Sequence, residues 1–473
     1  MDKQPEGLKI KREIGLIGGI SIVSGTMIGS GIFMSPQFVL SYVGSPGASL
    51  LVWALSGVVS MMAALCYTEL GTIIGDSGGE FIYIFRTYGP LPAFFDGLNL
   101  IVLSKPFGIA AMSISIAEYS LAPFYPGCAP PEFVVKCVGA AAILLVATVN
   151  SLNVRVAVRV QVVFLVAKVL ALTTIVIGGL VAVAQDSSTI VDNLSLENSF
   201  VGTGTSVSTF GMAFYQGLWS FAGWYNLNFV TEELKKPEVN LPKAIVVGVS
   251  LVTVLYLLVN VSYLSVMTPN ELMSSNAVAV TWGNKVLGRW GWIMSVAAAL
   301  SAFGSLNGSL FAGGRIVSVV AREGLLPDIL SMAHVRRLTP SPSLIFTTFI
   351  SLVVLLSGDF KTIVNYSSFV GWFFYAVTVS CVIYLRIKKP SLPRPYKVFI
   401  LLPVLVVAAS IFFVLTPILD NPQLEYLYVA LSLLSGIILY IPFIHYKVCP
   451  RLLTKLTVFL QVFLEVSPAE KNV

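Results

Sequence analysis

The sequence predicts an all-α integral membrane protein with twelve transmembrane helices, arranged as two inverted repeats of five helices followed by two more. Three observations predict this class. The 473 residues are 56% hydrophobic and only 11% charged, whereas soluble domains carry roughly 25% charged residues. Apolar stretches of about 20 residues, the length that crosses a bilayer, recur along the chain. Two of these stretches are interrupted by glycine at matching positions, a pattern typical of inverted-repeat membrane folds.

The apolar stretches define the expected elements in order. We expect membrane spans at 14–42, 48–74, 92–120, 133–150, 158–184, 209–231, 243–267, 290–320, 342–358, 361–386, 398–419 and 424–447. The first repeat would cover about 14–184 and the second about 209–386, so that helices 1 and 6 are the discontinuous ones. Residues 14–447 then form a single domain, with helices 11 and 12 at about 398–447. Residues 1–13 and 448–473 are short terminal segments, and the tail carries an amphipathic run that we expect to pack under the bundle.

The distribution of basic residues predicts the orientation. If the N-terminus is cytoplasmic, most of the 29 Lys and Arg residues fall on the cytoplasmic side, as the positive-inside rule requires. Both termini would then be cytoplasmic. The net charge of +6 reflects this topology, and we expect no nucleic-acid partner. The basic residues left on the outer side are Lys136, Lys285, Arg289 and Lys361.

Cysteine and histidine limit the chemistry that the chain can perform. The five cysteines form no Cys-x-x-Cys pair, and the two histidines, His334 and His445, fall at the cytoplasmic ends of predicted spans. A zinc or haem site would need more ligands than these. We therefore expect no metal and no cofactor. No nucleophile–base pair or metal cluster falls within the spans, so we do not expect an enzyme.

The first interrupted span contains Gly29-Ser30-Gly31. Glycine is unfavourable inside a helix, and unwound backbone at membrane depth occurs only where it is buried in protein or lines a cavity. A break here frees backbone N–H groups at the start of the following half-helix, where the helix dipole is positive. Such a helix start binds a carboxylate. The alternative is close helix packing through small residues.

The second interrupted span contains Ser220-Phe221-Ala222-Gly223. A half-helix that ends here presents free carbonyl groups, which can accept hydrogen bonds from an ammonium group. An anion site that faces a cation site fits a zwitterion such as an α-amino acid. Trp219 would be the aromatic wall of this site, whereas Trp224 and Tyr225 could equally be packing or interfacial aromatics.

Charged residues inside predicted spans are the next clue, because they are costly in a membrane and often functional. Lys168 lies near the middle of span five, where it could replace a bound cation; the alternative is a lysine that reaches the interface. Lys105 stands beside Pro106 and could face the cavity or pack against a kink. Arg315 lies towards the cytoplasmic end of its span, which favours an interfacial role.

At these residues the chain resembles the light chains of heteromeric amino acid transporters, in the amino acid–polyamine–organocation superfamily. The resemblance extends from Leu16 to about Pro468. It rests on motifs that include GTMIGSGIF (25–33), SGGE (77–80), FYPGCAPPEFVVKC (124–137), TVNSLNVR (148–155), GWYNLNFVTEEL (223–234), REGLLP (322–327) and RPYKV (394–398).

The resemblance implies a LeuT-type fold and sodium-independent exchange of amino acids. It implies that Ser30 and Gly31 bind the substrate carboxylate. It also implies that the backbone carbonyls of Met27, Trp219 and Ala222 meet the amine, with Trp219 as an aromatic gate. Lys168 matches a family lysine that occupies the position of a sodium site. The expected substrate-binding set is Met27, Ser30, Gly31, Trp219, Ala222 and Asn226.

The resemblance also implies a partner and a location. Cys128 matches a cysteine that is disulfide-bonded to a single-pass glycoprotein heavy chain, which brings the light chain to the plasma membrane. The alternative is an intrachain bond to Cys137. Asn193 begins the sequon Asn193-Leu194-Ser195 in a predicted outer loop and is a possible glycosylation site.

Position 222 narrows the expected substrate. The loop around Cys128 and the C-terminal run Ile444–Lys447 resemble those of the cystine and dibasic amino acid exchangers, which carry an aspartate at position 222. Ala222 removes the negative partner of a cationic side chain, and burying that cation unpaired costs several kcal/mol. Met27 also replaces the usual isoleucine. We therefore expect exchange of neutral, large or aromatic L-amino acids. The alternatives are exchange of cystine and dibasic together with neutral amino acids, or a membrane subunit that does not transport; no channel filter is visible.

Overall fold

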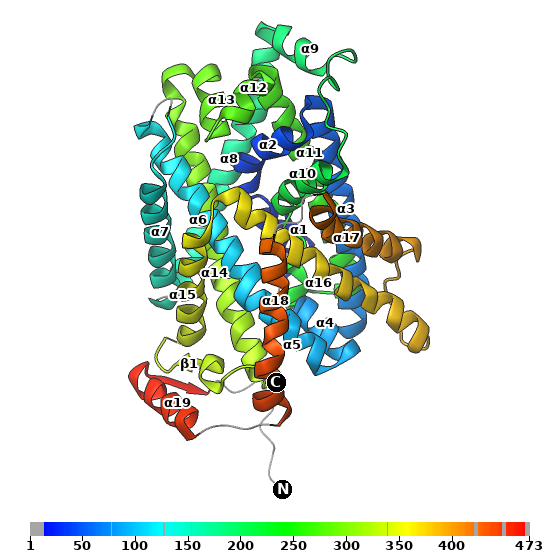
Figure 1. Ribbon diagram of the computed structural model, residues 1–473, viewed down its shortest axis with the longest axis vertical. Coiled ribbons are helices and arrows are strands. Elements are labelled where there is room, and N and C mark those ends of the chain that lie inside the picture. Colours follow the sequence, from blue (N-terminus) through cyan, green and yellow to red (C-terminus); the bar gives the residue numbers. More distant parts are fainter. Residues whose placement is uncertain are drawn as a thin grey trace.

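Helices account for most of the computed structural model, which describes residues 14–76, 78–125, 128–152, 154–337, 339–420, 424–446 and 451–468. Figure 1 shows many of them packed along the long axis of the molecule. Within the described residues, eight helical stretches are long and apolar enough to cross a membrane. The bent pair α1 (Leu16–Met27) and α2 (Gly31–Val43) makes a ninth. The structure is that of a helical membrane protein, as the sequence predicts.

Short connections separate the helices of the first part of the chain. After α2 these are α3 (Pro46–Ile74), α4 (Gly79–Tyr88), α5 (Pro90–Leu98), the π-helical η1 (Asn99–Ser104), α6 (Lys105–Leu121), the 3-10 segment η2 (Ala122–Phe124), α7 (Glu132–Leu152), α8 (Val154–Gln185) and α9 (Ser188–Leu194). Proline occupies the first turn of α3, α5 and α6, where its missing N–H costs no hydrogen bond. Gly44 and Gly75 follow α2 and α3 in the left-handed conformation that commonly ends a helix.

The second part of the chain repeats this pattern of long helices and short surface elements. It contains α10 (Val207–Ser220), the 3-10 segment η3 (Asn226–Glu233), α11 (Pro237–Val266), α12 (Pro269–Ser274), α13 (Val278–Val286), η4 (Gly288–Trp290), α14 (Trp292–Arg322), η5 (Asp328–Ser331), α15 (Ser341–Ser357), α16 (Phe360–Lys388), α17 (Leu401–Asp420), α18 (Leu424–Leu439), η6 (Tyr440–His445) and α19 (Arg451–Phe463). A capping box formed by Thr268 and Glu271 begins α12, and the Asp359 side chain caps α16.

Every one of the twelve expected ranges contains a helix. The expected division between 342–358 and 361–386 is correct, because α15 and α16 are separate helices. The range 209–231 differs from a simple helical span: α10 ends at Ser220, and a turn and the 3-10 segment η3 follow. Because α10, α15 and α18 are shorter than the other candidates, the count of twelve spans stays a prediction.

A two-stranded sheet ties the C-terminal tail to one end of the bundle. Figure 1 places this sheet and α19 at the end called here the lower end, and α9, α12 and α13 at the upper end. Strand β1 (Met332–His334) pairs antiparallel with β2 (Val466–Pro468), with His334 opposite Val466. The tail therefore packs against the connection between α14 and α15. The predicted segment 1–13 and residues 447–450 and 469–473 lie outside the described residues.

A buried ion pair joins α3 to α16. The Glu69 carboxylate accepts hydrogen bonds from the Arg386 guanidinium, with 3.0 Å between Nε and Oε1. Glu69 also accepts from the backbone N–H of Val398 at 2.8 Å. Glu69 is fully buried, and Arg386 is nearly so. This contact fixes the segment after α16 against the core.

Candidate binding site between two broken helices

The break between α1 and α2 leaves backbone donors without partners. The two helices are bent by 50° at residues 28–30. The N–H groups of Phe33 and Met34 bond to the Ser30 carbonyl, whereas the first N–H groups of α2, at Gly31 and Ile32, have no acceptor in the preceding turn. The predicted break is correct, and the second half-helix begins at Gly31.

The Ser30 hydroxyl adds a further donor at this break. Ser30 is buried, and its Oγ has no hydrogen-bond partner among the described residues. A buried hydroxyl without a partner is costly, and native structures usually satisfy such a group. Together with the start of α2 and its positive dipole end, it forms a site suited to a carboxylate.

The second break follows α10. The N–H of Ala222 donates to the Trp219 carbonyl at 3.0 Å, so the chain turns immediately after Ser220. Gly223 has φ 114°, a conformation that side chains rarely adopt. The Thr26 hydroxyl donates to the Gly223 carbonyl at 3.1 Å, which joins this turn to α1. The two predicted breaks therefore lie against each other.

Tyr256 of α11 lies between the two breaks and was not expected from the sequence. Its hydroxyl lies 2.7 Å from the Met27 carbonyl oxygen and 3.1 Å from the Ser220 carbonyl oxygen. The residue is fully buried. A tyrosine within a predicted span signals only that its hydroxyl needs a partner, so the sequence alone could not place it here.

A cavity of about 100 Å³ opens between the two breaks. It brings together five of the six expected substrate-binding residues, namely Met27, Ser30, Gly31, Trp219 and Ala222. Asn226 does not line it, because this residue begins η3 beyond the turn. Aromatic side chains form much of the wall, and they are Trp219, Trp224, Tyr225, Trp372 and Tyr375.

Lys168 of α8 does not line the cavity itself but contacts Ser305, which does. Its Nζ donates to the Gly25 carbonyl at 3.3 Å and to the Ser305 hydroxyl of α14 at 3.1 Å. The side chain is buried. A positive charge at the C-terminal end of α1 is favourable, because the last carbonyls of a helix carry partial negative charge. Lys168 therefore places a fixed positive charge against the last turn of α1 and links α1, α8 and α14.

Two serines of α14 support the first break and were also missed by the sequence analysis. The Ser301 hydroxyl donates to the Gly29 carbonyl at 3.4 Å. A side-chain carbon added at Gly29 would lie 2.9 Å from the Ser305 Oγ, so a larger residue here would require the Ser305 side chain to move. Serines within a predicted helix carry no signal of such a contact, because their hydroxyl can bond to their own backbone.

Lys105 also lines the cavity, next to the π-helical segment η1. Its Nζ lies 5.4 Å from the centre of the Tyr225 ring and 5.6 Å from that of Phe229. Both distances allow cation–π contacts. Lys105 is the one charged side chain among the described residues that line the cavity, so a positively charged substrate side chain would meet a like charge there.

Cys128 is exposed at the upper end and is not bonded to Cys137. The alternative of an intrachain disulfide between these two is therefore not realised in the structure. Cys137 lies within α7. Within the described residues, no group of three His, Cys, Asp or Glu side chains is placed to hold a metal ion.

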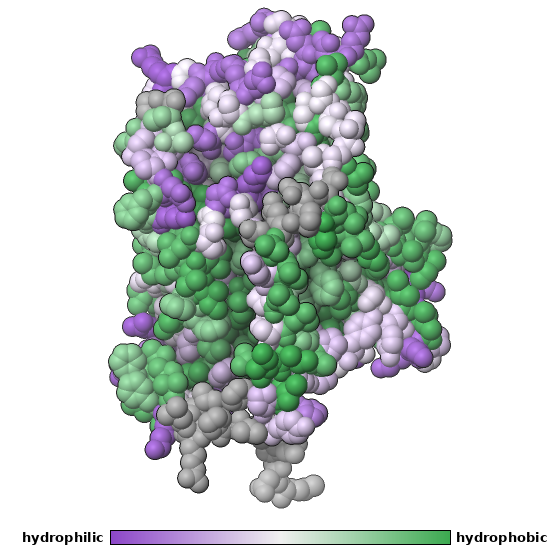
Figure 2. Space-filling view, viewed as in Figure 1, coloured by the Kyte–Doolittle hydropathy of each residue, from purple (hydrophilic) through white to green (hydrophobic). Residues whose placement is uncertain are grey.

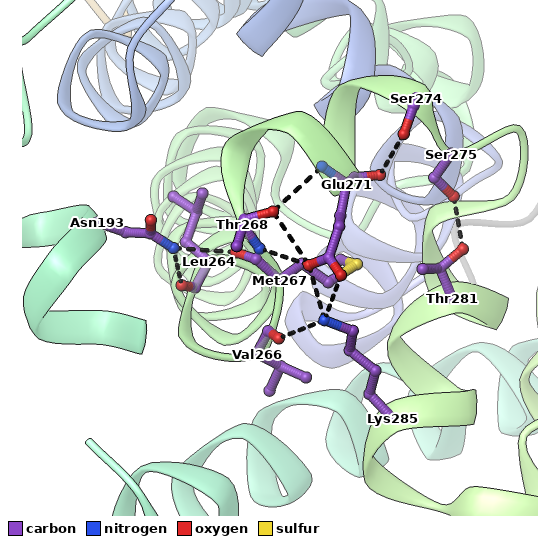
Figure 3. A network of polar contacts seen from close by, with 10 residues as sticks. All are labelled: Asn193, Leu264, Val266, Met267, Thr268, Glu271, Ser274, Ser275, Thr281 and Lys285. Carbon is purple, nitrogen blue, oxygen red and sulfur yellow. Dashed lines mark hydrogen bonds and ion pairs between the residues drawn. The ribbon is translucent and has the colours of Figure 1, made fainter. Parts of the chain in front are cut away.

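Asn193 is not presented as a glycosylation site. Figure 3 shows its side chain directed into the end of α11, where Nδ2 donates to the carbonyls of Leu264 and Met267 at 2.7 and 2.9 Å. The residue is buried. A glycan on Nδ2 would remove one of these bonds and would have no exposed path, so this arrangement argues against the possible modification.

A network of polar contacts near Asn193, at the upper end, contains the ion pair between Lys285 and Glu271. Lys285 Nζ lies 2.7 Å from the Glu271 carboxylate, which also accepts from the Thr268 N–H at 2.9 Å (Figure 3). The hydrogen bond from Lys285, followed by that from the Thr268 backbone, lowers the pKa of Glu271. Because the folded-state pKa is lowered, this contact stabilises the upper end at neutral pH and weakens as the pH falls through that pKa.

Comparison with known proteins identifies the family. The amino acid permease family profile matches residues 14–442. The human b(0,+)-type amino acid transporter 1 is 45% identical over 472 residues, which cover 99% of this chain and 96% of that protein. The human cystine/glutamate transporter is 38% identical over 476 residues, covering 99% and 94%. The mouse large neutral amino acids transporter small subunit 2 is 39% identical over 445 residues, covering 94% and 83%. These matches confirm the relationship that the motifs indicate, and the chain belongs to the amino acid permease family.

Proposed function

We propose that this chain exchanges neutral L-amino acids across the plasma membrane without sodium, by alternating access around the two broken helices. The proposal rests on one observation: two helix ends face each other across one cavity, and one offers hydrogen-bond donors while the other offers acceptors. The start of α2 offers free N–H groups and the unpartnered Ser30 hydroxyl, and the end of α10 offers carbonyls. A carboxylate and an ammonium group on one carbon satisfy both ends at once.

The order of the helices supports a proposed arrangement of the membrane spans. The spans would number twelve, with α1–α2 and α10 opening two inverted repeats of five and with α17 and α18 as the last two. Positive-inside charge supports a cytoplasmic lower end and cytoplasmic termini. Rocking of the repeats around a fixed midplane site would open one side at a time.

Sodium independence is supported by Lys168. Its ammonium group already contacts the Gly25 carbonyl and the Ser305 hydroxyl, oxygens of the kind that a sodium ion would need as ligands. A second cation at the same oxygens would be repelled by the lysine charge. The chain would therefore need no sodium to hold α1 and α8 together.

The substrate preference is supported by the cavity lining. Ala222 gives no negative partner for a cationic side chain, and Lys105 adds a positive charge. Aromatic residues supply an apolar surface for a large side chain. We therefore propose neutral substrates, large or aromatic ones in particular.

Uptake into proteoliposomes tests this proposal. We expect that vesicles preloaded with leucine take up tyrosine and leucine without sodium, and that empty vesicles take up much less. Arginine uptake should be low, and Ala222→Asp should raise it relative to leucine by about tenfold, because a new carboxylate can bond to the guanidinium. Strong arginine or cystine uptake by the unmodified protein would favour the dibasic alternative. No uptake of any amino acid by folded, partnered protein would favour a subunit that does not transport.

The partner is proposed to be a single-pass glycoprotein heavy chain, bonded through Cys128. The exposed thiol at the proposed outer end supports this pairing. We expect that Cys128→Ser eliminates the disulfide-linked heteromer on a non-reducing gel, whereas uptake per carrier at the surface is unchanged. Cys137→Ser is the matched control, because this cysteine is also exposed, and it should leave the linked band intact. Loss of the band in the control alone would assign the bond to Cys137.

A further inference from the structure

The helix α19 presents an apolar face away from the protein. Val458, Phe459, Val462 and Phe463 are all exposed, from 54% for Val458 to 74% for Val462. Leu456, which is seven residues before Phe463, is 49% exposed. Their spacing of three, four and seven residues places them on one side of the helix. The rings of Phe459 and Phe463 stack at 6.0 Å on this face.

The opposite side of α19 holds the helix to the protein. Leu460 and Leu464 are partly buried and pack against the hydrophobic core. The helix ends at Phe463, Glu465 follows in a left-handed conformation, and the chain then enters β2. The Val335 N–H donates to the Glu465 carbonyl at 3.0 Å, next to the β1–β2 pairs. The inner face is therefore fixed, and the exposed apolar face is not an unfolded end.

Two observations indicate that lipid covers this face. Figure 2 shows a hydrophobic patch at this corner of the molecule, below the hydrophobic sides of the long helices. Ile345 and Phe349 are exposed on α15, which follows β1 directly along the chain. A helix of 13 residues is too short to span a bilayer, but an amphipathic helix of this kind can lie in the interface.

Exposed cations surround the same corner. Lys455 lies on α19, and Arg336 and Arg337 follow β1; all three are exposed, and none forms an ion pair with a carboxylate of the described residues. Basic residues beside an apolar face favour anionic lipid, which is concentrated in the cytoplasmic leaflet. The exposed Glu465 offsets part of this charge, so the apolar face should supply most of the attachment.

We propose that α19 is an in-plane membrane anchor, with its apolar face inserted among the headgroups of the cytoplasmic leaflet. The inference goes beyond the proposed transport function, and only its choice of leaflet rests on the proposed orientation. The anchor would hold β2 and the connection between α14 and α15 at the membrane surface.

Spin labelling of the full chain with its heavy chain tests the proposal. Cys137 and Cys449 are replaced by serine, Cys128 is kept for the proposed disulfide with the heavy chain, and a nitroxide is attached at Val462→Cys in nanodiscs that contain phosphatidylserine. We expect high collision with oxygen and low collision with a water-soluble nickel chelate, as for a label about 5–10 Å below the headgroup boundary. The control Ser467→Cys, on exposed β2, should collide with the nickel chelate.

Each other result would overturn the anchor. High nickel accessibility at position 462 would place α19 in water. Low accessibility to both reagents would mean that protein covers the face, either the heavy chain or a second copy of this chain. Phe463→Cys repeats the measurement on the same face in case the first variant folds poorly. Because the readout does not use transport, its failure would leave the exchange proposal standing.

The basic residues give a second readout. Replacing Lys455, Arg336 and Arg337 by glutamine should abolish any difference in label depth between nanodiscs with and without phosphatidylserine. If the label in the unmodified protein lies equally deep in nanodiscs with and without phosphatidylserine, anionic lipid does not contribute to the attachment. The apolar attachment is decided by the oxygen and nickel measurement alone.

Discussion

Gly31→Ala is expected to lower amino acid exchange by about thirtyfold, with the protein still folded. A side-chain carbon at position 31 would lie 2.6 Å from the Ser220 Cα and 2.6 Å from its Oγ. Because a backbone atom blocks the space, α2 and α10 must move apart, and overpacking of this kind costs about 2 kcal/mol. The movement also displaces the free N–H groups at the start of α2. Exchange in preloaded proteoliposomes measures the effect.

A matched control separates this clash from a general effect of alanine in the broken pair. Gly25 lies in α1, and a carbon added there would touch only a methyl group of Leu165 at 3.4 Å, an ordinary contact. We expect that Gly25→Ala retains most of the exchange activity. Equal activity of the two variants would contradict the close packing of the two breaks. Elution as a single species from size exclusion would show that both are folded.

Glu69→Ala is expected to destabilise the fold by about 3–5 kcal/mol. The change would leave Arg386 as a buried charge without its carboxylate and the Val398 N–H without its acceptor. Arg386 is only 12% exposed, so most of its charge would stay without compensation. The measurement is the thermal unfolding midpoint in detergent, followed by size exclusion.

The chain provides a control pair on the surface. Asp76 and Arg86 form an ion pair at 3.0 Å, with side chains that are 44% and 58% exposed. We expect Asp76→Ala to change the free energy of unfolding by about 0–1 kcal/mol. If both variants unfolded at the same temperature as the parent protein, the buried pair would contribute no net stability. A similar loss of stability in both variants would indicate that the effect does not come from the burial of the Glu69–Arg386 pair.

The local composition of the chain predicts where the membrane helices and the two breaks lie. Apolar length defines a span, and the runs of glycine and other small residues at 29–31 and 220–223 mark the two interruptions. Tyr256 and Ser305 could not be found this way, because a tyrosine or serine in a helix looks the same whether it touches a break or the core. Their roles arise from contacts between residues distant in sequence.

The same limit applies to two candidate site residues whose surroundings the sequence could not show. Asn226 was expected at the cavity because it stands close to Ala222 in the chain. The turn through Gly223 and the 3-10 segment that follows carry it away from the cavity lining. Asn193 was expected to be accessible because it lies in an outer loop, but its amide is used to cap α11. A sequence motif shows neither the turn that moves Asn226 away from the cavity nor the use of Asn193 as a helix cap.

The Tyr256 contact has a consequence for hydrogen bonding where the two breaks meet. A hydroxyl has one hydrogen, so it can donate to the Met27 carbonyl or to the Ser220 carbonyl, but not fully to both. The two oxygens therefore compete, and one of them always keeps an unfilled lone pair when no substrate is bound. The ammonium group of an amino acid, with three hydrogens, would end that competition. Loading would then relieve a shortage of hydrogen-bond donors at the point where the two breaks meet.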